Sequence, residues 1–303
     1  MKVLGIPVKD MSLGSTRTRY YYMLNNLPEG WEYERYRPFA TGDVLYIQKT
    51  ETREVWSAIK DCKQRDIPIV YERDDFCKPW NEEHTKVMDA ADAITIITRG
   101  LLESVKHRTK TPMYFVPDGI DYDLKPEQKV PVRRDIRKII TYGRHANVEE
   151  AALYYKYINK KKYYICDRQI KEMRAARYIE WKLKNFIKKI SKCDLVVIVH
   201  ARNFRAKYKD PGRAMVAMAL GIPVIVNDNI EMSRIAKDIG SDFWLVKKPD
   251  DMKKAMKLLE DYRTRVKQSQ SMFEYAWKYY EPKKTSARLA EVFEKVIHEK
   301  SIS

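Results

Sequence analysis

One segment in the second half of the chain, residues 210–228, has the residue types of a phosphate-binding site. Asp210, Pro211 and Gly212 form a turn, and proline is pre-set for the first turn of a helix. The seven residues after Arg213 are all apolar, which predicts a buried helix. The first amides of such a helix, its positive dipole end and the arginine guanidinium all attract an anion. We therefore expect Gly212 and Arg213 to bind a diphosphate.

Carboxylates in the first half of the chain could accept a proton. Glu72, Asp74 and Asp75 follow one predicted strand, and Asp10 follows the first strand. The loops after the strands of an α/β sheet usually contain the working residues. A carboxylate within hydrogen-bond reach of a hydroxyl can take its proton, so Asp74, Asp75 and Asp10 are the candidate catalytic bases. The structural alternative is that these acids cap helices or pair with Arg73.

The loop between the first strand and the first helix offers a second binding segment. Gly14 and Ser15 could present an amide and a hydroxyl to a phosphate or sugar at the helix start. The loop does not contain the G-x-G-x-x-G fingerprint, and Ser15 can equally serve as a plain N-cap. Arg17 and Arg19 are expected to point toward the mouth of the site and to contact an acceptor.

Strands and helices alternate along the whole chain. The predicted strands are residues 2–6, 31–36, 44–48, 67–71, 93–97, 113–116, 139–141, 163–165, 195–199, 223–226 and 243–246. The helical patterns in the first half are residues 15–24, 52–64, 83–91 and 99–107. This alternation predicts parallel sheets with right-handed crossovers, and 303 residues suffice for two domains. The expected fold class is α/β, with two Rossmann-like domains that face a central cleft.

Positive charge is concentrated in the second half. The formal net charge is +17, yet residues 1–130 contain 20 Lys and Arg against 21 Asp and Glu. A 3.6-residue period predicts a helix over residues 168–192, with one basic strip beside Trp181. The strip consists of Arg174, Arg177, Lys184 and Lys188. It could follow a phosphate backbone, or it could be the solvated face of a Lys-rich protein.

The cysteines and the hydropathy restrict the class of protein. The four cysteines lie far apart, without a C-x-x-C pair or a nearby histidine at zinc-finger spacing, so we expect reduced thiols and no bound metal. No apolar run approaches the 18 or so residues of a membrane span. The first eight residues are too short for a signal peptide. A cytoplasmic location is expected.

The segment 210–228 resembles the donor-binding half of GT-B glycosyltransferases. Those enzymes contain a small turn, a basic residue, a helix and the run A-x-G-x-P-V-I, which is ALGIPVI at residues 219–225 here. The similarity extends over most of the chain. It implies an acceptor domain at residues 1–125, a nucleotide-sugar domain at 126–282, and a helix at 283–303 that crosses back to the first domain.

The resemblance also implies roles for single residues. GT-B enzymes commonly place a basic residue after the first strand of the second domain, so Arg144 and Arg213 would hold the donor diphosphate. Many retaining members have two glutamates at positions where this chain has Tyr208 and Val216. The ribose contact must then differ, and Asp228 is a substitute candidate. Whether transfer retains or inverts the sugar stereochemistry stays open.

The reaction implied is transfer of a sugar from a nucleotide-diphosphate sugar, such as a UDP-sugar, to a hydroxyl. No cofactor or metal would be bound, and the nucleotide sugar is a co-substrate. Two acceptors remain possible. One is 5-hydroxymethylpyrimidine in double-stranded DNA, as in viral DNA-modifying enzymes, and the other is a lipid-linked or surface glycan at an anionic membrane. The basic second half slightly favours DNA. A non-catalytic nucleic-acid-binding relative is the alternative of another class.

Overall fold

The computed structural model describes residues 1–74, 82–201 and 203–302. The chain forms two compact α/β units. Unit 1 consists of Met1–Gly119, Tyr208–Asp210 and Tyr280–Ser303, and unit 2 of Ile120–Lys207 and Pro211–Tyr279. The chain thus changes unit after Gly119, Lys207, Asp210 and Tyr279, whereas the sequence predicted boundaries at residues 125 and 282 only.

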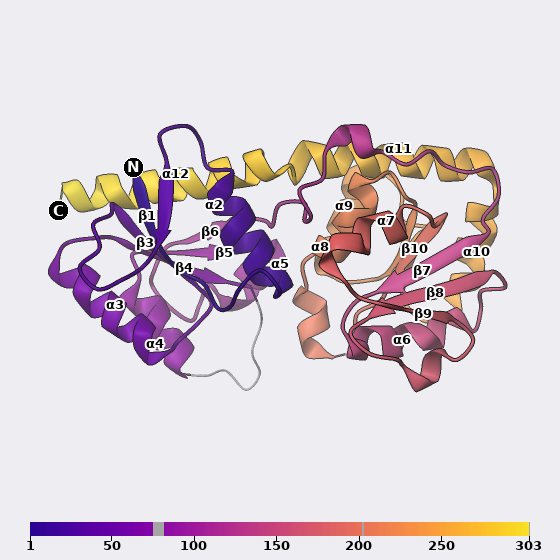
Figure 1. Ribbon diagram of the computed structural model, residues 1–303, viewed down its shortest axis with the longest axis horizontal. Helices are drawn as coiled ribbons and strands as arrows, with labels where there is room; N and C mark the ends of the chain where they lie inside the picture. Colours follow the sequence, from indigo (N-terminus) through magenta and orange to yellow (C-terminus); the bar gives the residue numbers. More distant parts are fainter. Residues whose placement is uncertain (75–81, 202, 303) are drawn as a thin grey trace. The chain divides into compact units, whose positions relative to one another are not determined.

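Unit 1 is built on a six-stranded parallel sheet in the order β2-β1-β3-β4-β5-β6 (Figure 1). The strands are β1 (Lys2–Ile6), β2 (Glu32–Arg35), β3 (Val44–Gln48), β4 (Ile69–Arg73), β5 (Ala93–Ile96) and β6 (Met113–Phe115). The helices are α1 (Gly14–Thr16), α2 (Met23–Asn25), α3 (Arg53–Gln64), α4 (Glu82–Ala90), α5 (Arg99–Val105) and α12 (Pro282–Ser301). A π-helical turn, Arg17–Tyr22, joins α1 to α2. The strand order changes direction between β1 and β3, so the first unit has its switch point there.

Apolar residues at helical spacing explain how unit 1 packs. On α3, Val55, Ala58, Ile59 and Cys62 are buried, and the Thr52 hydroxyl caps the helix start by accepting from the Val55 amide. The last helix, α12, packs against α2 and β5, and its Phe293 ring contacts Tyr46 of β3, so that its apolar stripe is buried in the core. That stripe consists of Leu289, Val292, Phe293 and Val296.

Unit 2 is built on a second six-stranded parallel sheet, in the order β12-β11-β10-β7-β8-β9. The strands are β7 (Lys138–Tyr142), β8 (Lys161–Cys166), β9 (Arg177–Glu180), β10 (Leu195–Ile198), β11 (Val224–Asn227) and β12 (Leu245–Val246). The helices are α6 (His145–Tyr155), α7 (Phe186–Ile190), α8 (Gly212–Ala219), α9 (Ile230–Ile239), α10 (Asp251–Glu260) and α11 (Tyr262–Tyr279). In chain order this is the 3-2-1-4-5-6 arrangement of dinucleotide-binding sheets, whose switch point lies between β7 and β10.

The predicted fold class, with two parallel α/β sheets, is confirmed, but the helix predicted over residues 168–192 is wrong. That segment forms a short turn at Lys171–Met173, the edge strand β9, a second turn at Leu183–Asn185 and the five-residue helix α7. Strand pairing overrides the helical period, because Tyr178 and Ile179 pair with β8, and the Tyr178 ring contacts Tyr164.

The basic strip therefore does not exist as one helix face. Arg174 follows the first turn, Arg177 begins β9, Lys184 lies in the second turn and Lys188 lies on α7. All four side chains are exposed.

Within the described residues, every helix is too short or too polar to cross a membrane.

Candidate active site

The guanidinium of Arg213 lies at the switch point of unit 2. Its Nη1 donates to the Tyr142 carbonyl at the end of β7, at 2.9 Å, and its Nη2 donates to the Val199 carbonyl after β10, at 3.0 Å. The same Nη2 lies 2.9 Å from the His200 Nδ1. The side chain thus spans the carboxyl ends of the two strands between which α/β sheets of this type bind their ligands.

Gly143 makes room for this guanidinium. Its φ is +151°, a backbone conformation that residues other than glycine rarely adopt. A Cβ at this position would lie 2.6 Å from the Arg213 Nη1. The Tyr142 hydroxyl donates to the Arg213 carbonyl at 2.7 Å, so the side chain and the backbone of Arg213 are both held by the end of β7.

The helix α8 begins at the same place. Pro211 is its N-cap residue and Gly212 its first residue, while the six residues from Ala214 to Ala219 are all buried. The first amides of a helix have no carbonyl partner inside the helix, and the positive end of its dipole lies there. The predicted anion-binding features, Gly212 and Arg213, therefore meet at the carboxyl edge of the sheet.

Polar side chains that the sequence analysis missed hold the loop after β10 in place. Asn227 accepts from the His200 amide at 2.8 Å and donates to the His200 carbonyl at 3.1 Å. Asn147 on α6 accepts from the Ala201 amide at 3.2 Å. His200 could have been found from its place directly after a buried strand. The two asparagines could not, because their partners are far away in the sequence.

The other predicted donor-binding residues of unit 2 also follow strands. Arg144 is exposed and is the N-cap residue of α6, directly after Gly143. Asp228 follows β11 and accepts from the Ser233 hydroxyl on α9. No contact between either side chain and Arg213 is seen among the described residues.

In unit 1 the loop after β1 lies at the switch point of the first sheet. Gln48 at the end of β3 accepts from the Val8 amide at 3.2 Å and donates to the Ser15 carbonyl at 2.9 Å, and so connects the loop to the helix start that Gly14 begins. Asp10 is exposed. Its carboxylate accepts from the Ser12 hydroxyl at 2.5 Å and from the Ser12 amide at 2.9 Å, and these hydrogen bonds lower the pKa of Asp10.

Beneath that loop, Arg19 forms the centre of a buried charge cluster. Its Nε and Nη2 donate to the two carboxylate oxygens of Asp118, at 2.7 and 2.9 Å, and its Nη1 donates to Asp74. Lys49 also pairs with Asp74, and the Glu72 Oε1 lies 3.7 Å from the Arg19 Nε. Only 5% of the Arg19 side chain is exposed, so its charge is balanced by protein carboxylates rather than by water.

Burial changes the protonation of this cluster. Burial raises the pKa of Glu72 to about 8, against the pull of the Arg19 charge, and raises the pKa of Asp118 to about 6. The two carboxylate oxygens of Glu72 accept no hydrogen bond from any residue that the structure describes. Burial therefore favours the protonated form of Glu72 within this cluster.

This proton makes the stability of unit 1 depend on pH. The folded protein retains the Glu72 proton up to about pH 8, whereas an exposed glutamate loses it near 4.5. The contribution of the protonated Glu72 to the free energy of unfolding is thus complete below pH 4.5, and it is lost as the pH rises to about 8. We expect Glu72→Gln to match the wild type near pH 5 and to exceed it by roughly 2–4 kcal/mol at pH 8.5, in urea denaturation. The exposed Glu103→Gln is the control, and parallel pH curves for Glu72→Gln and wild type would refute the shifted pKa.

The position of the arginines and acids in unit 1 corrects part of the sequence analysis. Arg17 and Arg19 were expected at an exposed mouth, but they are 3% and 4% exposed, because the π-helical turn directs them inward. Arg17 donates to the Met11 carbonyl at 3.1 Å. Asp74 is 4% exposed and already pairs with two cations. Asp75 lies outside the described residues.

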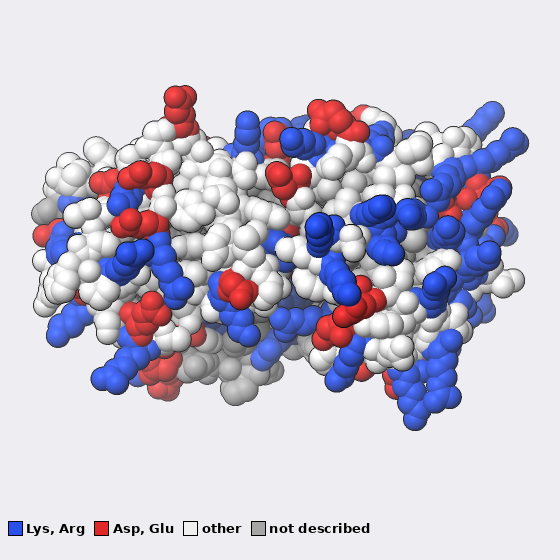
Figure 2. Space-filling model, in the orientation of Figure 1, with Lys and Arg blue, Asp and Glu red and all other residues white. Residues whose placement is uncertain are grey.

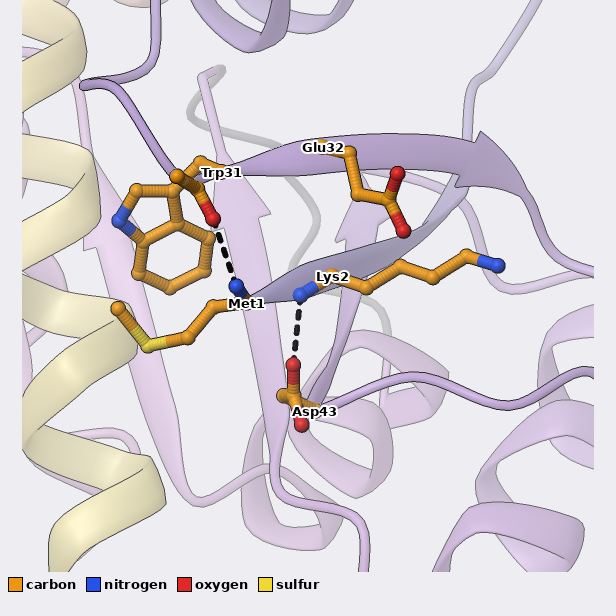
Figure 3. Close-up of a pocket in the computed structure, with 6 residues that line it drawn as sticks. Met1, Lys2, Trp31, Glu32 and Asp43 are labelled. Carbon is orange, nitrogen blue, oxygen red and sulfur yellow. Dashed lines mark hydrogen bonds between the residues drawn. The ribbon is translucent and has the colours of Figure 1, made fainter.

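A pocket of about 400 Å³ in unit 1 lies at the amino ends of the strands, which is the end of the sheet opposite to the loop after β1. Figure 3 shows its lining around the amino ends of β1 and β2. The Met1 amine donates to the Gly30 carbonyl at 2.7 Å, and the Lys2 amide donates to the Asp43 carboxylate at 2.6 Å. Ligands of open α/β sheets bind at the carboxyl ends of the strands. The pocket is therefore separate from the candidate site.

No protein-family model and no curated sequence matches the chain. Solved structures do match at low identity. An S. aureus TarM variant in complex with Fondaparinux, alpha-GlcNAc-glycerol and UDP is 11% identical with a TM-score of 0.64, and the match covers 83% of this chain but only 56% of TarM. AviGT4, a glycosyltransferase involved in Avilamycin A biosynthesis, is 11% identical with a TM-score of 0.59 over 98% of both chains.

A third match is the E. coli trehalose-6-phosphate structure bound with UDP-2-fluoro glucose, at 11% identity and a TM-score of 0.59, over 85% of this chain and 74% of that one. Identities this low bear on the fold alone. Together with the two parallel six-stranded sheets, the matches show that the chain has the GT-B fold.

Proposed function

We propose that the protein is a glycosyltransferase that moves a sugar from a nucleotide-diphosphate sugar to an acceptor hydroxyl. The observation that carries this proposal is the placement of Arg213, which joins the ends of β7 and β10 at the start of α8. A guanidinium and a helix N-terminus at a switch point are groups that commonly bind phosphates in α/β sheets, and this supports the assignment of a diphosphate. The solved structures with UDP or a UDP-sugar and the same fold support the choice of ligand.

In this proposal the diphosphate is the leaving group. Negative charge grows on its oxygens as the bond to the sugar breaks, and Arg213 and the α8 amides stabilise that charge. Of the two candidate bases that the structure describes, Asp10 is exposed and Asp74 is buried, so Asp10 is the one assigned to accept the acceptor proton. Its hydrogen bonds from Ser12 lower the pKa of Asp10, so the carboxylate is ionised at neutral pH and open to a proton, although the same shift makes it a weaker base.

The experiment that tests the function is mass analysis of products after incubation with a panel of nucleotide sugars. We expect at least one nucleotide sugar to be hydrolysed slowly without an acceptor and to be consumed faster with one. The Arg213→Ala variant should lose this activity. A folded protein that binds nucleic acid and consumes no nucleotide sugar would favour the non-catalytic alternative.

We expect activity to persist in excess chelator. The diphosphate charge is assigned to Arg213 and the helix start, which can replace a metal ion. Among the described residues, no group of three or more His, Cys, Asp or Glu side chains could hold a metal ion. Turnover would be measured with EDTA and again after adding magnesium or manganese. Complete loss in EDTA that either metal restores would contradict metal independence.

The acceptor we propose is 5-hydroxymethylpyrimidine in double-stranded DNA, because unit 2 is strongly basic. It contains 35 Lys and Arg against 19 Asp and Glu, a net charge of +16, whereas unit 1 has a net charge of +1. On the face shown in Figure 2, Lys and Arg side chains gather over unit 2. A surface of this kind attracts a phosphate backbone. An anionic membrane that presents a glycan acceptor is the alternative.

Reversing two of these charges, in Lys184→Glu with Lys188→Glu, should weaken duplex DNA binding. The slope of log affinity against log salt should flatten by about one unit per lost phosphate contact. The matched control reverses the exposed Lys60 and Lys63 on α3 of unit 1 and should leave the slope unchanged. No DNA binding at low salt, combined with binding to anionic vesicles, would replace the DNA acceptor by the membrane alternative.

A further inference from the structure

The imidazole of His200 lies against the guanidinium that we assign to the diphosphate. Its Nδ1 is 2.9 Å from the Arg213 Nη2, and both residues belong to unit 2. An arginine side chain has only N–H donors and is not deprotonated in proteins, so the Nδ1 must accept this hydrogen bond. A ring nitrogen that accepts cannot carry a proton. His200 is therefore a neutral imidazole with its proton on Nε2.

This hydrogen bond occupies one of the two N–H groups of the Arg213 Nη2. The other donates to the Val199 carbonyl at 3.0 Å, and Nη1 donates to the Tyr142 carbonyl at 2.9 Å. Acceptors on both terminal nitrogens fix the plane of the guanidinium. Two of these three acceptors are backbone carbonyls at strand ends, whereas the third is a side chain. The contact with His200 is thus the one of the three that a substitution can remove.

His200 is itself held in place by other elements of unit 2. Asn227 at the end of β11 is 9% exposed, and it accepts from the His200 amide at 2.8 Å and donates to the His200 carbonyl at 3.1 Å. Asn147 of α6 accepts from the next amide, that of Ala201, at 3.2 Å. With its backbone fixed in this way, the imidazole can orient the guanidinium, because a supporting residue is effective when its own position is locked.

We propose that His200 is a positioning residue that orients Arg213 for nucleotide-diphosphate binding. By accepting from Nη2, the neutral imidazole holds the guanidinium in one orientation before the donor binds, which reduces the ordering that binding requires. This inference rests on the proposed function, because it requires that the diphosphate binds at Arg213. His200 acts through Arg213 and does not need to touch the donor.

The test is calorimetry of UDP and uridine with three His200 variants. His200→Ala should weaken UDP binding about three- to tenfold, the usual net effect of one hydrogen bond, and leave uridine affinity unchanged. In His200→Asn the amide oxygen is as many bonds from the backbone as the histidine Nδ1, so UDP affinity should stay within about twofold of wild type. His200→Gln, whose amide is one bond farther out, should behave like His200→Ala. The exposed His107→Ala of unit 1 is the control and should leave UDP affinity unchanged.

A double-mutant cycle with Arg213→Ala separates the two claims. In the Arg213→Ala background, His200→Ala should cause no further loss of UDP affinity, since the group that it orients is gone. An additive loss, an equal loss of UDP and uridine affinity, or no loss in His200→Ala alone would overturn the positioning role while the donor site stands. If Arg213→Ala itself leaves UDP binding unchanged, the donor site is wrong and this inference fails with it.

The tautomer is tested without any donor. The ring ¹⁵N shifts of His200 near neutral pH should be those of a neutral imidazole protonated at Nε2. A proton on Nδ1 would overturn the proposal whatever the binding experiments show.

Discussion

Arg213→Ala is expected to weaken binding of a nucleoside diphosphate at least tenfold, since a hydrogen bond to a charged group contributes about 1.5–3 kcal/mol. The side chain lies where the diphosphate is proposed to bind, and no other arginine described in the structure joins the ends of β7 and β10. Removing it leaves the helix start as the main source of positive potential. Calorimetry at fixed salt measures the change.

Two further variants make this result specific. Arg213→Lys should give an intermediate loss, because lysine keeps the charge but not the planar fork that contacts two oxygens. The exposed Arg263→Ala on α11 is the control for the loss of one positive charge from unit 2. Wild-type affinity for Arg213→Ala, with an unchanged thermal midpoint, would contradict the assignment of the donor site.

Arg19→Met should destabilise unit 1 by about 3–5 kcal/mol, which is the usual cost of leaving one charge of a buried ion pair without its partner. The substitution removes the shared cation of Asp118 and Asp74, and both carboxylates are nearly inaccessible to water. Urea denaturation at pH 7, followed with a probe in unit 1, measures the loss.

A second substitution identifies the origin of that loss. Adding Asp118→Asn to Arg19→Met should recover part of the stability, because the carboxylate that lost its partner is also removed. A loss below about 1 kcal/mol for Arg19→Met would mean that water enters the cluster and that the pairs are worth no more than surface pairs.

The sequence allowed a sound prediction of the parallel sheets and of the α8 start, because the signals involved are local. The apolar helix α8 and the β-branched strand β11 follow each other within 20 residues, and the apolar residues of each predict that it is buried. Arg144 and Arg213 lie far apart in the sequence, and their shared role at the diphosphate was predicted from resemblance rather than from periodicity. The close approach of Gly143 to Arg213 was not predicted.

The errors have a common physical cause, which is pairing at long range. The edge strand β9 was assigned to a helix because apolar residues from Met173 to Ile190 fit a 3.6-residue period, whereas the pairing of Tyr178 and Ile179 with β8 fixes it as a strand. Arg19 was placed at the mouth of the site because it follows the loop after the first strand, but it is buried. Its main partner, Asp118, is 99 residues away. No pattern within one segment could identify that pair.

The most direct test of the proposed donor site is a comparison of wild-type affinities for UDP, UMP and uridine at constant ionic strength. The second phosphate is the group that should reach Arg213 and the α8 amides. We expect UDP to bind at least tenfold more tightly than UMP, with a difference that Arg213→Ala largely removes. Equal affinity for UDP and UMP, or no binding of either, would contradict a diphosphate site at the start of α8.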